Sequence, residues 1–220
     1  MKAFKFIIII LSIFFAIGYA IAFFHIAKDF NIQEMSEQFF LIGFAVFIPF
    51  WYLWLRRNGF YSTFEHEFTH LIVGLMFFKK PAGFTATANE GGVTAMYGGN
   101  FIITLAPYFL PTFVYLILPM YLVIDARFIK YYFAVLGFLT SYHVLSTLQE
   151  FGFHQTDITK SGKTFSCIFL TFANIFIYGI LLAFVINGFA NSWIFIKAGF
   201  FGSVDWVMWI VNLVKGIIAG

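Results

Sequence analysis

Four ionisable side chains lie close together in an otherwise uncharged stretch, residues 60–78: Glu65, His66, Glu67 and His70. Three of them form the pattern H-E-x-x-H. Residues four apart share one face of a helix, so both imidazoles can reach one metal ion, and the Glu67 carboxylate can reach a water molecule beside it. Zinc lowers the pKa of such a water to about 7, and Glu67 can then take its proton. The pattern predicts a hydrolytic zinc site with His66 and His70 as ligands and Glu67 as general base and acid.

The surroundings of these charges bear on this interpretation. An ionisable side chain at the centre of a membrane span costs about 2.5–3.5 kcal/mol on insertion scales, so its presence there needs a reason. The simpler alternative is a set of polar residues that face the interior of a helical bundle and hydrogen-bond each other. The H-E-x-x-H spacing favours the metal site. Glu65 is expected to lie near the mouth of the span or to hydrogen-bond one of the histidines.

A third zinc ligand must come from elsewhere in the chain, because a catalytic zinc ion takes three protein ligands and keeps one open position. The candidates are His143, His154 and Asp157. At 1.5 Å per residue, His70 lies about 15 Å into its apolar stretch and His143 about 18 Å into its own, so their depths match. His154 and Asp157 fall in the connection 150–163, and Asp157 reaches the metal only if that connection dips into the protein.

The composition sets the environment in which this chemistry takes place. Of 220 residues, 61% are hydrophobic and only 10% are charged, against about 25% charged in soluble domains. This excludes a soluble globular protein and also intrinsic disorder. The basic residues come in short clusters that are too small for a nucleic-acid surface, so no nucleic-acid partner is expected. We expect one integral membrane domain over residues 1–220, with the lipid bilayer as its partner.

Six apolar segments are long enough, or nearly so, to cross a bilayer, which takes about 20 residues. They are 4–27, 39–55, 60–78, 101–124, 131–149 and 164–187. The first exceeds the usual length of a signal-peptide core and is interpreted as a transmembrane helix. The stretch 193–219 is expected to form an interfacial helix or a seventh span. The fold class is therefore an all-α polytopic membrane protein, with Lys and Arg too evenly divided between the two sides to orient it.

Two segments after the H-E-x-x-H pattern carry further expectations. Residues 84–97 alternate small polar and apolar side chains around a glycine pair, which predicts a short β-hairpin. Either its edge pairs with an extended substrate, or the segment is a structured loop that covers one membrane face. Asn100 follows Gly98 and Gly99 and is a candidate to hydrogen-bond a substrate carbonyl or oxyanion. The prolines of the fourth span should kink it; they are Pro107, Pro111 and Pro119.

An H-E-x-x-H pattern inside a membrane span resembles the site-2 protease (M50) family of intramembrane zinc metallopeptidases. The resemblance extends over about residues 60–165 and includes three further stretches: Glu90-Gly91-Gly92-Val93-Thr94, Gly98-Gly99-Asn100 with Ala106-Pro107, and His154-Gln155-Thr156-Asp157-Ile158. In the last stretch the isolated Asp157 stands where the family has its third metal ligand. The Leu-Asp-Gly or Asn-Pro-Asp-Gly string that usually surrounds that ligand is not present, and no inserted regulatory domain is recognisable.

The resemblance implies a zinc metalloendopeptidase with a protease-like core at about residues 60–187. Its cofactor would be Zn²⁺, held by His66, His70 and Asp157, and its substrate a membrane protein cut within or near its span. The expected location is the bacterial inner membrane. Two alternatives stay open: a membrane protein with a structural or sensory metal site, and a metal transporter. Transport is disfavoured because the charge is concentrated on one span rather than spread along a path.

Overall fold

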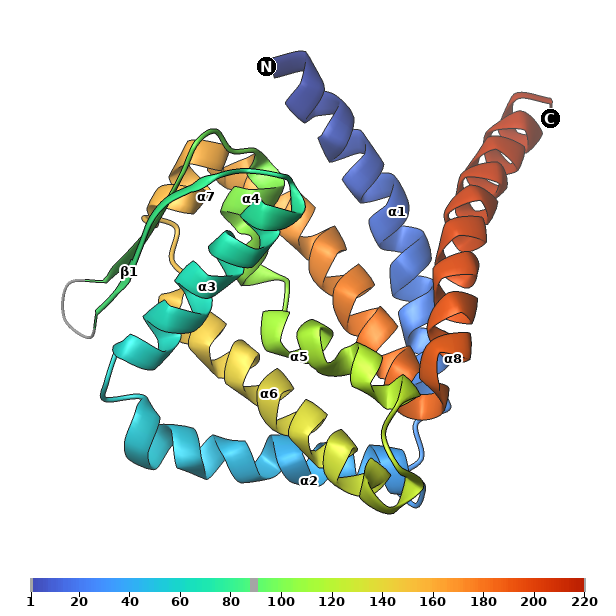
Figure 1. Cartoon of the computed structure of the whole chain (residues 1–220). Helices are drawn as coiled ribbons and strands as arrows, with labels where there is room; N and C mark the ends of the chain where they lie inside the picture. Colours follow the sequence, from blue (N-terminus) through green and yellow to red (C-terminus); the bar gives the residue numbers. More distant parts are fainter. Residues whose placement is uncertain (1, 88–90, 220) are drawn as a thin grey trace. The chain divides into compact units, whose positions relative to one another are not determined.

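The computed structural model describes residues 2–87 and 91–219 (Figure 1). The chain divides into two compact units, one formed by Met1–Asn31 with Thr164–Gly220 and the other by Ile32–Lys163. All residues of the H-E-x-x-H pattern and all three candidates for the third ligand belong to the second unit. The protease-like core expected at about 60–187 therefore includes residues of both units.

The first unit consists of α1 (Lys2–Lys28) and α8 (Lys163–Ala219). Helix α8 is interrupted at Asn187 and Gly188, where the backbone leaves helical geometry and Gly188 adopts a positive φ of 65°. The segments on either side fold back on each other, since Ser192 Oγ donates to the carbonyl of Ile180 at 3.1 Å. Glycine is suited to this reversal because it has no Cβ to clash at positive φ.

Small residues let α1 approach the second segment of α8 closely. A Cβ added at Gly18 would lie 2.3 Å from the Ser203 nitrogen and 2.6 Å from the Gly199 carbonyl oxygen, so only glycine fits there. Tyr19 donates from its hydroxyl to the Ile196 carbonyl at 3.0 Å. Such small-residue contacts are typical of helix packing in membranes, where close backbone approach replaces the hydrophobic driving force.

The second unit holds a mixture of long and short elements. In chain order they are α2 (Met35–Phe50), which continues into a π-helical turn η1 (Trp51–Leu55), then α3 (Phe60–Met76), β1 (Pro81–Ala86), β2 (Gly92–Met96), α4 (Phe101–Leu105), η2 (Ala106–Tyr108), α5 (Thr112–Ile117), η3 (Leu118–Leu122), η4 (Ala126–Phe128), α6 (Ile129–Glu150) and α7 (Thr156–Ser161). Helices α2 and α6 lie side by side (Figure 1). Gly43 and Gly137 allow this contact, because a Cβ at either would strike the backbone of the other helix.

Four helices of the described residues are long and apolar enough to cross a membrane: Ala3–Lys28, Met35–Leu55, Ala126–Glu150 and Lys163–Ile218. A fifth is counted if the pair Phe101–Tyr108 and Thr112–Leu122, which is bent by 94°, is one broken span. Pro111 lies in the break, as expected for a residue that cannot continue a helix. These helices confirm a predominantly helical chain with several apolar spans. Helix α3, with 17 residues, is short of a full crossing.

The predicted hairpin is present as the antiparallel pair β1 and β2, and it begins at Pro81 rather than at Phe84. Glu90, which the predicted turn contains, lies outside the described residues. The hairpin packs along α3 (Figure 1). Thr94 Oγ1 donates to the Glu67 carbonyl at 2.8 Å, and the backbone at Gly92 approaches Glu67 closely. The hairpin thus covers the helix turn that carries the H-E-x-x-H pattern.

Candidate metal centre

Helix α3 presents His66 and His70 on one face, with their ring centroids 4.9 Å apart. The Nδ1 atom of His70 lies 2.8 Å from the carbonyl oxygen of Ile103 in α4. A carbonyl only accepts hydrogen bonds, so this nitrogen carries a proton and the Nε2 atom is the one that can bind a metal. The Ile103 carbonyl therefore fixes both the orientation of the ring and the nitrogen that faces the site.

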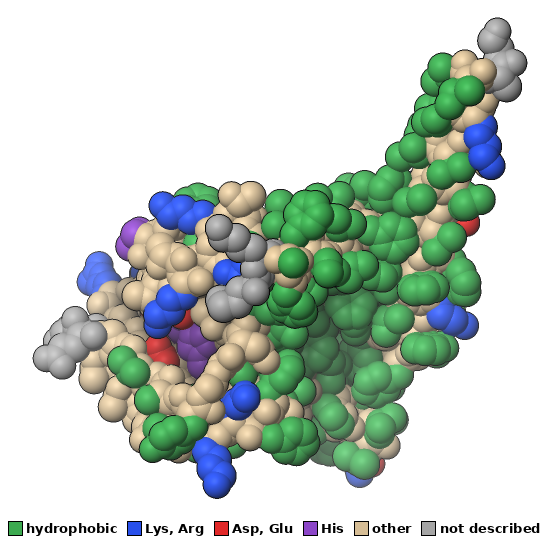
Figure 2. Space-filling view, turned by 90° about the horizontal axis from the view of Figure 1, so that it is seen from above, with side chains coloured by type: hydrophobic (Ala, Val, Ile, Leu, Met, Phe, Trp, Pro, Cys, Tyr) green, Lys and Arg blue, Asp and Glu red, His purple; other side chains and the backbone are tan. Residues whose placement is uncertain are grey.

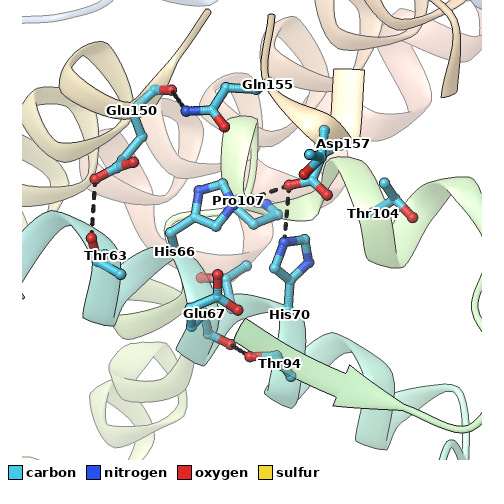
Figure 3. A network of polar contacts seen from close by, with 12 residues as sticks. Thr63, His66, Glu67, His70, Thr94, Thr104, Pro107, Glu150, Gln155 and Asp157 are labelled. Atoms are coloured by element: carbon cyan, nitrogen blue, oxygen red, sulfur yellow. Dashed lines mark hydrogen bonds and ion pairs between the residues drawn. The ribbon is translucent and has the colours of Figure 1, made fainter. Parts of the chain in front are cut away.

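Asp157 joins the two histidines from α7. Its Oδ2 atom lies 3.1 Å from His66 Nε2 and 3.2 Å from His70 Nε2 (Figure 3). The chain reaches this point because it turns sharply after α6, where the side-chain Nε2 of Gln155 donates to the backbone carbonyl of Glu150 at 2.9 Å. Ile158, only 1% exposed, then anchors α7 in the unit. The connection 150–163 does dip into the protein, which is the condition on which Asp157 depended.

The three side chains fit a zinc ion by donor type and by spacing. Their candidate ligand atoms all lie within 4.8 Å of one another. In a tetrahedral site with bonds of 2.0–2.1 Å, ligand atoms are about 3.3–3.4 Å apart, close to the two separations measured from Asp157. Without a metal, both Nε2 atoms would need protons to face the same carboxylate oxygen, and His70 would then be cationic because Nδ1 also carries one. One metal ion satisfies all three groups at once.

The charge state of Asp157, which lies outside the candidate spans, is also suited to binding a cation. Burial by itself would raise the pKa of this carboxyl, but hydrogen bonds donated by the Nε2 atoms of His66 and His70, which can form only when no metal is bound, outweigh it and hold the pKa well below its usual range. Asp157 is therefore a carboxylate at neutral pH.

Glu67 lies beside these three residues and is 8% exposed. Together with them it lines a cavity of about 330 Å³, whose other walls come from the hairpin at Gly91–Thr94 and from the end of α6. Figure 2 shows a hollow with histidine and acidic side chains at its bottom and with Lys or Arg side chains around it. The arrangement leaves the side of the histidine–aspartate group that faces the cavity accessible to water and to a ligand.

A second cavity of about 290 Å³ adjoins the first, since both are lined by His70, Thr94, Asp157 and Lys160. It continues past Met96 to Gly98 and Gly99. The two cavities together follow β2 along its length. Because β1 covers the other edge of β2, the edge toward the cavities is the one available for a further strand.

His143 does not lie with the other two histidines, although its depth matches theirs. Its Nδ1 atom lies 2.6 Å from Oε1 of Glu65, and Ser146 donates to Oε2 of the same carboxylate at 2.7 Å. Glu65 is 2% exposed, so this is a buried network between α3 and α6. Glu65 pairs with a histidine as expected, but with His143 rather than with His66 or His70.

The other two sequence candidates are not members of the histidine–aspartate group. His154 is exposed on the turn before α7. Asn100 caps α4, where its side-chain oxygen accepts a hydrogen bond from the Ile103 backbone at 2.9 Å. Its proposed contact with a substrate stays a prediction, and the structure gives the side-chain oxygen a structural role.

Two residues that the sequence did not single out lie at the site. Tyr108 is 3% exposed, and its ring meets His66 edge-on at 5.3 Å. Glu150 lines the first cavity at the end of α6. Tyr108 follows Pro107 directly, so a proline break inside an apolar segment was the available signal. For Glu150, the signal was a carboxylate at the end of an apolar helix.

Comparisons of the chain with models of protein families, with curated proteins and with solved structures give no match.

Proposed function

We propose that this chain is an intramembrane zinc metalloprotease of the site-2 protease type. The observation that carries the proposal is the convergence of His66, His70 and Asp157 on one point, with Glu67 on the wall of the same cavity. Three ligands and one accessible side are what a catalytic zinc site needs. A site that serves structure alone is usually closed by a fourth protein ligand and has no use for Glu67.

The residues have separate tasks in this proposal. His66, His70 and Asp157 would hold the zinc ion, and the Ile103 carbonyl keeps the His70 ring in an orientation suited to binding it. When bound, the ion supplies an activated water and polarises the carbonyl of the peptide bond. The Glu67 carboxylate takes a proton from the attacking water and delivers it to the nitrogen of the departing peptide. The C–O bond to the water oxygen forms first, the C–N bond breaks when the nitrogen has received the proton, and Glu67 ends as a carboxylate again.

The free edge of β2 offers a way to hold the substrate. Thr87 donates to the Gly91 carbonyl at 3.0 Å, so these residues are a hydrogen-bonded pair of the hairpin. Antiparallel pairing alternates, which directs the backbone N–H and C=O groups of Gly92 and Thr94 away from β1 and toward the cavity edge. An unwound segment that adds there as a third strand has its backbone carried past Glu67 and His70.

The membrane arrangement is part of the same proposal. The two segments of α8 count as separate crossings and the bent pair around Pro111 as one, which, together with the other three long helices, makes six. Helix α3 adds a seventh, shorter apolar element. An apolar chain of this kind belongs in a bacterial inner membrane, and its substrate would be a membrane-spanning or membrane-proximal segment of another protein.

The decisive variant is Glu67→Gln, with zinc content and cleavage of a co-expressed transmembrane substrate both measured. We expect zinc to be retained and cleavage to be abolished, because glutamine keeps the shape but cannot accept the proton. Glu34→Gln is the matched control, since Glu34 is exposed at the start of α2. Cleavage by Glu67→Gln at the wild-type rate would show that the proteolytic assignment is wrong.

The ligand set is tested by zinc quantification in purified single-alanine variants. His66→Ala, His70→Ala and Asp157→Ala should each lose stoichiometric zinc, whereas His154→Ala should keep it. Zinc that stays bound in all four variants contradicts the metal site. Wild-type protein that binds zinc and cleaves no membrane substrate would instead favour a structural or sensory metal site.

A further inference from the structure

We infer that the first cavity selects a basic side chain of the substrate, close to the cleaved bond, and that Glu150 recognises it. The inference rests on the proposed function, because it concerns what enters the same cavity. It starts from a carboxylate that lines the cavity but is neither a member of the candidate metal group nor the proposed proton carrier.

Glu150 occupies an electrostatically unfavourable position. It is the last residue of α6, a 22-residue helix, and a negative charge at a helix C-terminus is opposed by the helix dipole. The carboxylate is nevertheless held in place, since its Oε1 atom accepts hydrogen bonds from Ser62 Oγ at 2.6 Å and from Thr63 Oγ1 at 3.4 Å. Figure 3 shows it on the opposite side of His66 from Asp157. The two hydroxyl groups therefore fix the position of the carboxylate before any ligand binds.

The charge of Glu150 is not neutralised within the part of the chain that the structure describes. None of the ion pairs found between residues 2–87 and 91–219 includes it. Lys160 is the one cationic side chain among the residues that line the first cavity, and it also lines the second, which Glu150 does not reach. The end of the first cavity near Glu150 therefore presents a carboxylate with no ion-pair partner among the described residues, and a Lys or Arg side chain from a ligand would complete the pair.

The hairpin relates Glu150 to the proposed cleavage point. A Cβ at Gly92 would lie 2.7 Å from Thr63, which holds Glu150, and 2.5 Å from Glu67. Thr94, two residues further along β2, lies against Glu67 and lines the cavity with His70. At about 3.3 Å per residue, a strand added along this edge passes from Glu150 to the metal group within about two or three residues. The basic side chain is therefore expected within three positions of the cleaved bond.

A structural role for Glu150 makes a different prediction. If the carboxylate only ties the end of α6 to the start of α3, Glu150→Gln should preserve its effect, because a glutamine oxygen still accepts hydrogen bonds from Ser62 and Thr63. Recognition of a cation, in contrast, depends on the charge that this substitution removes. A structural role and a recognition role can therefore be distinguished by ligand binding. With a recognition role, Glu150→Gln weakens the binding of basic ligands only, whereas a structural effect changes the binding of all ligands equally.

The test uses peptide binding to zinc-loaded, full-length Glu67→Gln protein, which holds a substrate without cutting it. The probes are fluorescein-labelled peptides of one neutral extended sequence, each with a single Lys at a different position, together with the same sequence carrying norleucine there. We expect one Lys position to bind about tenfold more tightly than its norleucine counterpart, as for a charge-assisted hydrogen bond. Adding Glu150→Gln should remove that difference and leave the norleucine peptides unchanged, while adding Glu34→Gln should change neither.

Each outcome bears on one proposal or the other. Equal binding of all Lys and norleucine peptides, a preference that persists with Glu150→Gln, or no binding of any peptide overturns the inference. Wild-type cleavage without any Lys preference leaves the protease standing and removes only the role of Glu150. A Lys preference that depends on Glu150, in a wild-type protein that cleaves none of the peptides, supports the recognition site and counts against proteolysis.

Discussion

The contact between β2 and α3 at Gly92 allows a sharp test of the site geometry, because the structure leaves no space for one added methyl group. A Cβ at this position would lie 2.5 Å from Glu67 Cγ, 2.7 Å from Thr63 Cγ2 and 2.9 Å from the Thr85 carbonyl oxygen. Gly92 does not need positive φ, unlike Gly91 at 76°, so alanine causes no backbone strain there. The perturbation of Gly92→Ala is purely one of space.

The size of the effect follows from these distances. An ordinary carbon–carbon contact is about 3.5–4.0 Å, so the strand or the Glu67 side chain must move by about 1 Å. Overpacking of this kind costs about 1–3 kcal/mol of stability. A shift of about 1 Å in a catalytic group lowers a rate by about a hundredfold. Because the three atoms nearest the added methyl group belong to Glu67, Thr63 and Thr85 rather than to His66, His70 or Asp157, zinc binding should persist.

The assay compares Gly92→Ala with Gly83→Ala, a control in the partner strand where an added Cβ meets nothing within 4 Å. Thermal unfolding in detergent, zinc content and cleavage rate are measured for both. We expect Gly83→Ala to match the wild type, and Gly92→Ala to keep zinc, unfold at lower temperature and cleave about a hundredfold more slowly. If the two variants behave alike in unfolding and cleavage, β2 does not pack on Glu67 as described.

Three further variants test the contacts around the site and in the first unit. Thr94→Val removes the hydrogen bond to the Glu67 carbonyl and should lower the unfolding free energy by about 1 kcal/mol, measured by chemical denaturation, without loss of zinc. Glu65→Leu removes the buried carboxylate that faces His143 and Ser146 and should cost about 3–5 kcal/mol in the same measurement, part of which returns when His143 is also replaced by leucine. Gly18→Ala should lower the thermal stability of the first unit while zinc content stays at the wild-type level, whereas Gly216→Ala, where an added Cβ meets nothing within 4 Å, should change neither.

Local patterns in the sequence were enough to predict several parts of this structure. Long apolar runs predicted α1, α2, α6 and α8, because a helix that satisfies its own backbone hydrogen bonds is the natural form of such a run in a membrane. Alternating small residues around glycines predicted the hairpin, and Pro111 marks the break in the fourth apolar segment. The i and i+4 spacing of His66 and His70 predicted that both rings share one face of a helix. All of these follow from the period of a single element.

The residue that faces the two histidines was decided by tertiary structure. Depth favoured His143, and α6 does bring it next to α3, but it meets Glu65 instead. Glu65 precedes His66 by one residue, which is a rotation of about 100° around the helix. Which of these faces turns toward α6 depends on the packing of every side chain between the two helices, and no spacing in the sequence encodes it.

The same holds for Asp157, Glu150 and the edge of β2. Asp157 reaches His66 and His70 because the chain reverses after α6 and the Ile158 side chain is buried. This brings Asp157 next to two histidines that precede it in the sequence by 91 and 87 positions. Glu150 enters the cavity only because that helix ends beside the start of α3. A helix that can present two imidazoles and a carboxylate was predictable from local residue spacing, since this depends on helical period alone. The tertiary structure decided which carboxylate meets them and what lines the space in front, since these depend on contacts between distant segments.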